Sequence, residues 1–282
     1  MQTNYILNIG ISSYAYAWSV GTPGRLPDLP LTAFGLIDKA VRLSVNYVQL
    51  CDNIALDCFT KHDLEELFQY ALQNNVHIEV GALGLTAARL EQYIEIARVL
   101  KSKILRFVID KGNYTPSIPQ TAGIIKDFTA VLEKEGIYLA IENHDRLQSR
   151  DYLKLLHKTQ SNFVRICLDT VNSLGAGEGI ATVLNELGPW TVNLHVKEYA
   201  IRRVENKMGF LVEGKPLGKG QLPLPDVLKK ISPLCKTAVL EQWVPFTGKL
   251  ETTIQKEEDW ASESINHLKK IMSQSPVVLM SQ

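Results

Sequence analysis

Short apolar segments recur along this chain at nearly even intervals, and a segment with the periodicity of an amphipathic helix follows each of them. The apolar segments span residues 6–11, 47–51, 76–80, 104–109, 137–141, 163–168, 191–196 and 237–240. Most are rich in β-branched residues and apolar throughout, which is typical of parallel strands covered on both faces. The mean step between them is about 33 residues, the length of one βα unit.

The amphipathic segments complete this alternating pattern. They span residues 31–43, 61–73, 87–100, 118–134, 150–159, 179–187, 225–231 and 259–271. Eight strands alternating with eight helices are typical of a (β/α)8 barrel or of a doubly wound sheet. No Gly/Ser/Pro-rich linker divides the chain, so residues 21–30 and 202–224 are interpreted as long βα loops that serve as access or lid elements. We therefore predict an α/β protein in which residues 1–282 form a single (β/α)8 TIM barrel domain.

The charge and cysteine content argue against several kinds of protein. Thirty Lys and Arg residues balance thirty Asp and Glu residues, so neither nucleic acid nor a membrane surface is expected as a partner. No apolar run approaches the ~20 residues of a membrane span, and no signal peptide is expected at the N-terminus. The cysteines Cys51, Cys58, Cys167 and Cys235 form no C-x-x-C motif. Two of them lie in or beside apolar runs, as buried thiols do, so a reduced, cytoplasmic protein is expected.

Acidic and histidine side chains stand where four successive apolar segments of the second half end. These residues are Glu142, Asp169, His195 and Glu241, at intervals of 27, 26 and 46 residues. The intervals match successive βα units with one long insertion. Because the C-terminal ends of parallel barrel strands share one face, the four side chains should converge at the mouth of the barrel.

Three carboxylates and one imidazole form an oxygen-rich set of metal ligands. Such a set suits one divalent ion, Mn²⁺, Mg²⁺, Co²⁺ or Zn²⁺, with coordination positions left open for substrate oxygens. Taken singly, an acid at a strand end can also be a helix N-cap or an ion-pair partner, and a lone histidine is more often a core residue. The joint pattern favours the metal site, since four such residues on consecutive strands seldom arise as unrelated caps.

The sequence around these residues resembles a known superfamily. The matching segments are Ile141-Glu142-Asn143-His144, Leu168-Asp169-Thr170, Leu194-His195-Val196-Lys197-Glu198 and Leu240-Glu241-Gln242-Trp243. They resemble the xylose isomerase-like TIM-barrel superfamily, and most of all its sugar phosphate isomerase/epimerase branch. Tagatose 3-epimerase, inosose dehydratase and hydroxypyruvate isomerase belong to the same group. The resemblance extends over essentially the whole chain.

The resemblance implies a metal-dependent isomerase or epimerase of a small sugar, keto-polyol or sugar derivative. Its metal ligands would be Glu142, Asp169, His195 and Glu241. The two glutamates would also act as the acid/base pair around a metal-stabilised cis-enediolate. His144 and Lys197 match positions that contact or polarise the substrate. For Lys197, a salt bridge to Glu142 or Asp169 is the alternative.

The chain departs from the epimerase pattern at three positions. Asn172 stands where the epimerases usually have a histidine, and Gln148 where they usually have a glutamate. Their arginine six residues after the metal histidine falls on Ile201. Two alternatives therefore stay open: a metal-dependent dehydratase of a cyclic polyol, and a non-catalytic barrel that binds metal and sugar. The trinuclear zinc site of the DNA-repair endonuclease relatives is not expected, because few of the histidines end a strand.

Further substrate contacts are expected from the loops at the mouth. Trp18 follows the first strand and Trp243 the eighth, so both could form aromatic walls for a sugar ring, with packing as the alternative. Arg202 begins a cationic loop that could hold a phosphate or a sugar-acid carboxylate, with a solvated lid as the alternative. The expected partner is thus a small carbohydrate, and a homo-oligomer stays open.

Overall fold

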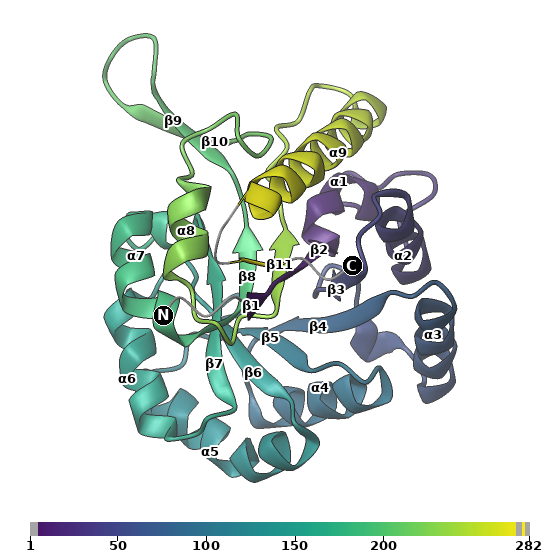
Figure 1. Cartoon of the computed structure of the whole chain (residues 1–282), viewed down its shortest axis with the longest axis vertical. Coiled ribbons are helices and arrows are strands. Elements are labelled where there is room, and N and C mark those ends of the chain that lie inside the picture. The colour runs from purple at the N-terminus through teal and green to yellow at the C-terminus, as the bar shows by residue number, and fades with distance from the viewer. Residues whose placement is uncertain (1–4, 275–277, 280–282) are drawn as a thin grey trace.

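The structure, a computed structural model, describes residues 5–274 and 278–279 and contains eight parallel strands that close into a barrel (Figure 1). The barrel strands are β2 (Asn8–Ser12), β3 (Tyr47–Leu50), β4 (His77–Leu83), β5 (Ile104–Val108), β6 (Tyr138–Glu142), β7 (Val164–Asp169), β8 (Thr191–Val196) and β11 (Thr237–Leu240). Their order in the barrel follows the chain, and β11 closes it by pairing with both β8 and β2. The predicted (β/α)8 barrel is confirmed.

Helices cover the outside of this barrel. They are α2 (Ala33–Arg42), α3 (Lys61–Gln73), α4 (Ala87–Val99), α5 (Ile118–Glu135), α6 (Ser149–Thr159), α7 (Ile180–Leu187), α8 (Leu224–Lys230) and α9 (Leu250–Gln274), and a short α1 (Ala17–Val20) follows β2. Every predicted helical segment is thus a helix. Most ends lie within two residues of the expected ones, whereas α9 begins nine residues earlier than predicted. No helix among the described residues combines the length and the apolar character needed to cross a membrane.

Local sequence sets several of the helix boundaries. At the start of α3, the hydroxyl of Thr60 accepts a hydrogen bond from the Asp63 N–H while the Asp63 carboxylate accepts one from the Thr60 N–H. Ser117 and Gln120 form the same reciprocal capping box before α5. Helix α5 ends at Gly136, whose φ of 63° lies in the left-handed region that glycine adopts without a Cβ clash.

Two loop and strand predictions are wrong. The predicted loop 202–224 overlaps an antiparallel hairpin of β9 (Tyr199–Arg203) and β10 (Phe210–Gly214), which projects beyond the end of β8 (Figure 1). Each strand has an apolar run of three residues, 199–201 and 210–212, next to charged residues, and most side chains of the hairpin are exposed. The predicted first strand, 6–11, is split: β1 (Tyr5–Ile6) pairs with β12 (Val278–Leu279), and β2 begins at Asn8. Residues 21–30 form a loop with a turn closed between Thr22 and Arg25.

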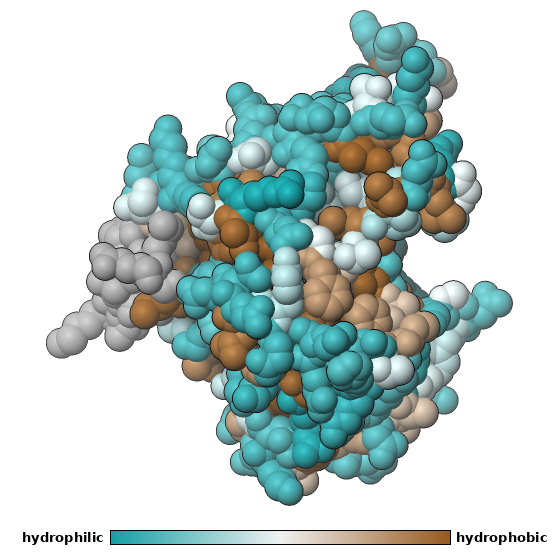
Figure 2. All heavy atoms as spheres, turned by 90° about the vertical axis from the view of Figure 1, so that its right-hand side faces the viewer, coloured by the Kyte–Doolittle hydropathy of each residue, from teal (hydrophilic) through white to brown (hydrophobic). Residues whose placement is uncertain are grey.

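The apolar core lies mainly between the barrel and its helices, whereas the inside of the barrel is partly polar. Fully buried side chains such as Leu50, Val80 and Phe107 belong to the apolar core. Several polar side chains on the barrel strands are equally buried, among them Gln49, Glu79, Arg106, Asn193 and Thr237. On the outside, the face drawn in Figure 2 is mainly hydrophilic, with apolar residues in small groups between the polar ones. The functional site is built partly from these buried polar side chains.

Candidate metal centre and active site

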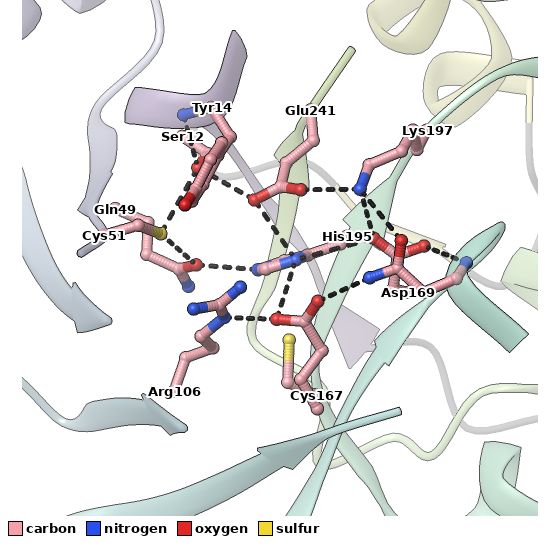
Figure 3. A network of polar contacts seen from close by, with 12 residues as sticks. Ser12, Tyr14, Gln49, Cys51, Arg106, Cys167, Asp169, His195, Lys197 and Glu241 are labelled. Carbon is pink, nitrogen blue, oxygen red and sulfur yellow. Dashed lines mark hydrogen bonds and ion pairs between the residues drawn. The ribbon is translucent and has the colours of Figure 1, made fainter. Parts of the chain in front are cut away.

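The structure brings Glu142, Asp169, His195 and Glu241 together at the C-terminal end of the barrel. Glu142 and Asp169 are the last residues of β6 and β7, His195 lies in β8, and Glu241 follows β11. Strand register aligns them, since Asp169 pairs with His195 across β7 and β8. All four side chains are buried, and Figure 3 shows those of Asp169, His195 and Glu241 pointing toward one another. The predicted convergence is therefore present.

The space between these side chains is surrounded by ligand atoms. His195 Nδ1 lies 3.3 Å from Glu241 Oε1, 3.5 Å from Glu142 Oε2 and 3.9 Å from Asp169 Oδ2. Although it is fully buried, His195 Nδ1 makes no hydrogen bond to any residue in the described part of the chain. A buried imidazole nitrogen that faces three carboxylates without a hydrogen bond is unfavourable unless a proton or a metal ion takes its lone pair.

The ligand types and spacing at this position fit a divalent ion. Ligand atoms of Asp169, His195 and Glu241 all lie within 4.8 Å of one another. The thiol of Cys167 is adjacent, but it donates a hydrogen bond to Asn193 Oδ1 at 3.0 Å, and burial raises its pKa well above the ordinary value. The remaining ligands are oxygen and nitrogen atoms, which suit a hard or borderline ion of the predicted kind.

Lys197 inserts a positive charge between two of the acids. Its Nζ lies 2.8 Å from Asp169 Oδ2 and 2.9 Å from Glu241 Oε2, and 5.1 Å from the centre of the Trp243 ring. Burial alone would lower the pKa of Lys197, but the neighbouring carboxylates raise it above the ordinary value. Lys197 is therefore an ammonium ion. Of the two salt bridges left open by the sequence, the one to Asp169 is formed.

Arg106 is a second buried cation, and the sequence analysis missed it. It lies in β5, where its Nε is ion-paired with Glu142 and its Nη1 lies 3.3 Å from Asp52 Oδ1. Burial opposes its charge, but the neighbouring acids, Glu142 first, raise the pKa of Arg106 well above its ordinary value. A signal was present in the sequence, because a charged residue in the middle of a buried strand requires a partner of opposite charge.

The two glutamates proposed as an acid/base pair are both held by hydrogen-bond donors. Glu241 accepts a hydrogen bond from Ser12 Oγ at 2.9 Å as well as the ion pair from Lys197. Burial would raise the pKa of Glu241, but positive charge around it, that of a protonated His195 first and then that of Lys197 and Arg106, lowers it below the ordinary range. Glu142 accepts a 2.8 Å hydrogen bond from Asn172 Nδ2 on Oε1 and is paired with Arg106 through Oε2.

A cavity of about 810 Å³ opens above this centre, a size that suits a small molecule. Its wall includes Tyr14, Asp52, Arg106, Asp110, Lys111, Glu142, His144, Arg146, Asn172, Lys197, Glu241 and Trp243. Of the expected substrate contacts, His144, Lys197 and Trp243 thus line the cavity. Tyr14 donates a hydrogen bond to Asp52 Oδ2 at 2.8 Å, which ties the loop after β2 to the cavity wall.

Trp18 and Arg202 do not line this cavity in the described structure. The Trp18 indole N–H donates to the Val244 carbonyl at 2.8 Å, and its ring packs against Phe246 with 5.4 Å between centroids. Arg202 lies on the projecting β9, where it is exposed and 3.5 Å from Glu213. The loop after β2 turns Trp18 toward the segment that follows β11, and the hairpin carries Arg202 away from the barrel. The structure therefore does not place either residue at the cavity, and a substrate contact by Trp18 or Arg202 stays a prediction.

The three departures from the epimerase pattern have different surroundings. Asn172 lies in the site, where it donates to Glu142 and its Oδ1 is 3.4 Å from Lys197 Nζ. Gln148 donates to the Ala176 carbonyl at 3.3 Å and does not line the cavity. Ile201 is exposed on β9. Asn172 alone of the three therefore alters the contacts of a proposed ligand.

Comparison with curated proteins identifies relatives along nearly the whole chain. A 3-oxo-isoapionate decarboxylase from Pectobacterium atrosepticum is 28% identical over 262 residues, which cover 92% of this chain and 94% of the relative. The uncharacterized protein YihM from Escherichia coli is 21% identical, with 89% of this chain and 77% of that protein covered.

Solved structures share the fold at low sequence identity. D-psicose 3-epimerase with D-tagatose, from Clostridium cellulolyticum H10, has a TM-score of 0.71 and 14% identity, with 94% of this chain and 99% of that chain covered. The probable 3-DHS dehydratase AsbF from Bacillus anthracis has a TM-score of 0.65 and 14% identity, with coverages of 93% and 99%. A family model described as xylose isomerase-like TIM barrel matches residues 38–271. This chain therefore belongs to the xylose isomerase-like TIM barrel family.

Proposed function

We propose that this chain is a divalent-metal-dependent enzyme that forms an enediolate from a small hydroxyketone related to a sugar. The observation that carries the proposal is the unpartnered Nδ1 of His195, which faces three carboxylates beneath an open cavity. An ion held by these four side chains would supply positive charge to the developing enediolate oxygens. The family and its fold support this class of chemistry, and the enzyme's own residues decide which bond breaks.

Among the reactions that form an enediolate, we favour decarboxylation of a 3-oxo sugar acid with a hydroxyl group at C2. Removal of a carbon-bound proton needs a basic carboxylate. In this site Glu241 accepts from Ser12 and Lys197, and both oxygens of Glu142 accept from donors, so neither carboxylate is free to act as a base. Loss of CO₂ needs no base, because the electrons of the broken C2–carboxylate bond pass to the 3-oxo group. The decarboxylase that is 28% identical over most of this chain supports the same choice.

Two buried cations in the cavity wall suit an acidic substrate and its product. Arg106 and Lys197 offset the carboxylates, so an anionic acid is not repelled as it would be by the acids alone. After CO₂ leaves, the carbanionic carbon must take up one proton to give the ketone. The Lys197 ammonium group lines the cavity and can donate that proton, after which solvent restores it.

An isomerase or epimerase is the second candidate, because Glu142 and Glu241 line the same cavity from strands on different sides of the centre. That arrangement is what proton removal and return by two carboxylates requires. The solved epimerases of the same fold are in keeping with it.

Product analysis in D₂O separates these functions. The metal-loaded protein is incubated with 3-oxo sugar acids and, separately, with ketoses. We expect release of CO₂ from an acid, with one deuterium incorporated at the former C2. Deuterium exchange without CO₂ release would indicate the isomerase, loss of water the dehydratase, and saturable binding without exchange a non-catalytic barrel.

Metal dependence is tested on the same reaction. Removal of the ion with a chelator, or an Asp169→Asn variant, is expected to abolish turnover, and added Mn²⁺ should restore it only in the chelated wild type. Full activity in a metal-free preparation would contradict the proposal.

A further inference from the structure

A chain of buried hydrogen bonds runs down the inside of the barrel from His195 to a carboxylate that is remote from the metal centre. His195 Nε2 lies 2.7 Å from Gln49 Oε1, a contact that is visible in Figure 3. Gln49 Nε2 donates in turn to Glu79 Oε2 at 3.0 Å. The three side chains come from β8, β3 and β4, and all are at most 3% exposed.

Glu79 is surrounded by donors. Thr237 Oγ1 donates to its Oε1 at 2.7 Å, while Gln49 Nε2 and Asn193 Nδ2 donate to its Oε2 at 3.0 and 2.9 Å. In all three contacts the neighbour is the donor and a Glu79 oxygen is the acceptor. Burial raises the pKa of Glu79 to about 7, and the three hydrogen bonds oppose part of that increase.

The contacts at Glu79 determine which atom of the Gln49 amide group faces His195. Gln49 has one amide nitrogen, and that nitrogen is already used toward Glu79 and toward Asn193 Oδ1, at 2.9 Å. The amide oxygen of Gln49 must therefore face His195. An acceptor opposite Nε2 requires a proton on Nε2, which leaves the lone pair of the neutral ring on Nδ1, the atom that faces the three carboxylates.

We propose that Glu79, acting through Gln49, is a positioning residue that holds the His195 proton on Nε2 and so makes Nδ1 the metal-binding nitrogen. The proposal rests on the metal site of the proposed function. Partners that orient a metal-binding histidine in this way typically change metal affinity by about 10- to 100-fold.

The test compares Glu79→Gln and Gln49→Met with a matched control, Glu257→Gln. Glu257 is also buried, its carboxylate accepts hydrogen bonds from Ser19 and Trp18, and its pKa is likewise raised to about 7. It lies on α9 outside the barrel, so it reports the general effect of removing a buried carboxylate. Where Glu79→Gln does not fold, Thr237→Val removes one of the three donors to Glu79 with little change of shape.

Two readouts are needed, and neither is catalytic activity. Zn²⁺ affinity is measured by competition with a chromophoric chelator, and ring-nitrogen NMR of ¹⁵N-histidine-labelled protein reports which nitrogen of His195 carries the proton. We expect Glu79→Gln and Gln49→Met to weaken Zn²⁺ binding by about 10- to 100-fold. We also expect faster exchange of the Nε2 proton in both, while Glu257→Gln matches the wild type.

Wild-type Zn²⁺ affinity in both barrel variants, with an unchanged Nε2 proton, would overturn the proposal. Failure of the wild type to bind any divalent ion would instead overturn the proposed function. NMR of the metal-free chain then still decides the tautomer. A hydrogen-bonded Nε2 proton that is lost in Gln49→Met supports the positioning role, and a neutral ring protonated on Nδ1 refutes it.

Discussion

Lys197 is the proposed proton donor, and its role can be separated from its ion pairs. Lys197→Met keeps the aliphatic stem and removes the ammonium group, so the decarboxylated intermediate loses its nearby acid. We expect kcat to fall by about 10²- to 10⁴-fold, the usual range for a general acid. Steady-state kinetics with a 3-oxo sugar acid measures this effect. Lys215→Met, which removes one of two cations paired with Glu213 outside the cavity, is the control and should leave kcat unchanged.

If Lys197 served only as an ion-pair partner, its variant would unfold more easily while kcat per folded, metal-loaded molecule stayed the same. That outcome would exclude the proton-donor role.

Arg106 is expected to be essential for stability because its removal leaves buried carboxylates without a partner. Arg106→Met takes the positive charge from Glu142 and Asp52, and breaking a buried ion pair typically costs about 3–5 kcal/mol. Arg98→Met breaks an exposed pair with Glu95 and a pair with the half-buried Glu135, and should cost at most about 1 kcal/mol. Denaturant unfolding of the metal-free chain compares the two. Equal losses would show that the charge of Arg106 is not needed to offset the acids.

At the residue scale, the sequence predicted the acids and histidine at strand ends but not the polar side chains inside the barrel. Position at a strand end follows from the βα repeat, so Glu142, Asp169 and His195 could be found by counting. The contact between Gln49 and His195 joins β3 to β8, and only the closed barrel with its strand register brings them together. The path of a loop is not set by spacing either, so the packing of Trp18 against Phe246 could not be predicted.

At the element scale, the Glu198 side chain holds the segment between the β9–β10 hairpin and α8 in place through hydrogen bonds. Its Oε1 accepts from the N–H groups of Tyr199 and Leu222, and its Oε2 accepts from that of Gly218, at 2.8–3.0 Å. Gly220 packs so closely here that an added Cβ would overlap the Tyr199 carbonyl and the Glu198 carboxylate. Only a residue without a Cβ fits between them.

Gly220→Ala is therefore expected to destabilise the protein by about 1–3 kcal/mol, the usual range for overpacking. Gly123→Ala is a matched control, because Gly123 lies within α5 with open space around it. The control should raise the free energy of unfolding by about 0.5–1 kcal/mol, since alanine favours the helix. Denaturant unfolding measures both variants. If Gly220→Ala raised the free energy of unfolding as Gly123→Ala does, an added Cβ at Gly220 would cause no strain.

The start of α9 shows why periodicity alone misplaces an element. Its first two turns bury Thr253 and Glu257, which are polar and therefore contribute nothing to an apolar stripe. Glu257 instead accepts hydrogen bonds from the backbone of Trp18 and Ser19 and so joins α9 to α1. A helix held by polar contacts to a distant segment cannot be delimited from its own sequence.

At the scale of the whole molecule, acidic and basic residues are equal in number, but the buried charged side chains of the described chain are mostly acidic. The acids of the metal centre lie beside Arg106 and Lys197. Glu79 and Glu257 are instead buried beside hydrogen-bond donors, and neither is ion-paired with Arg106 or Lys197. Burial raises the pKa of Glu79 and that of Glu257, to about 7 for each. The pH dependence of stability near neutrality should therefore come from these two groups.

The sign of that dependence follows from proton binding. A glutamate with a pKa of about 7 in the folded chain and 4.5 as its model value holds a proton that the unfolded chain has already released. Its stabilising contribution is complete below pH 4.5 and is lost as the pH rises through 7, by up to about 1.4 kcal/mol per pH unit for each group. We expect the free energy of unfolding of the metal-free chain to fall between pH 5.5 and 7.5, by roughly these amounts.

Glu257→Gln cannot titrate and should show a shallower fall, whereas Glu251→Gln, at the exposed start of α9, should keep the wild-type slope. Parallel pH profiles for Glu257→Gln and the wild type would show that Glu257 is already ionised in the folded protein across this range.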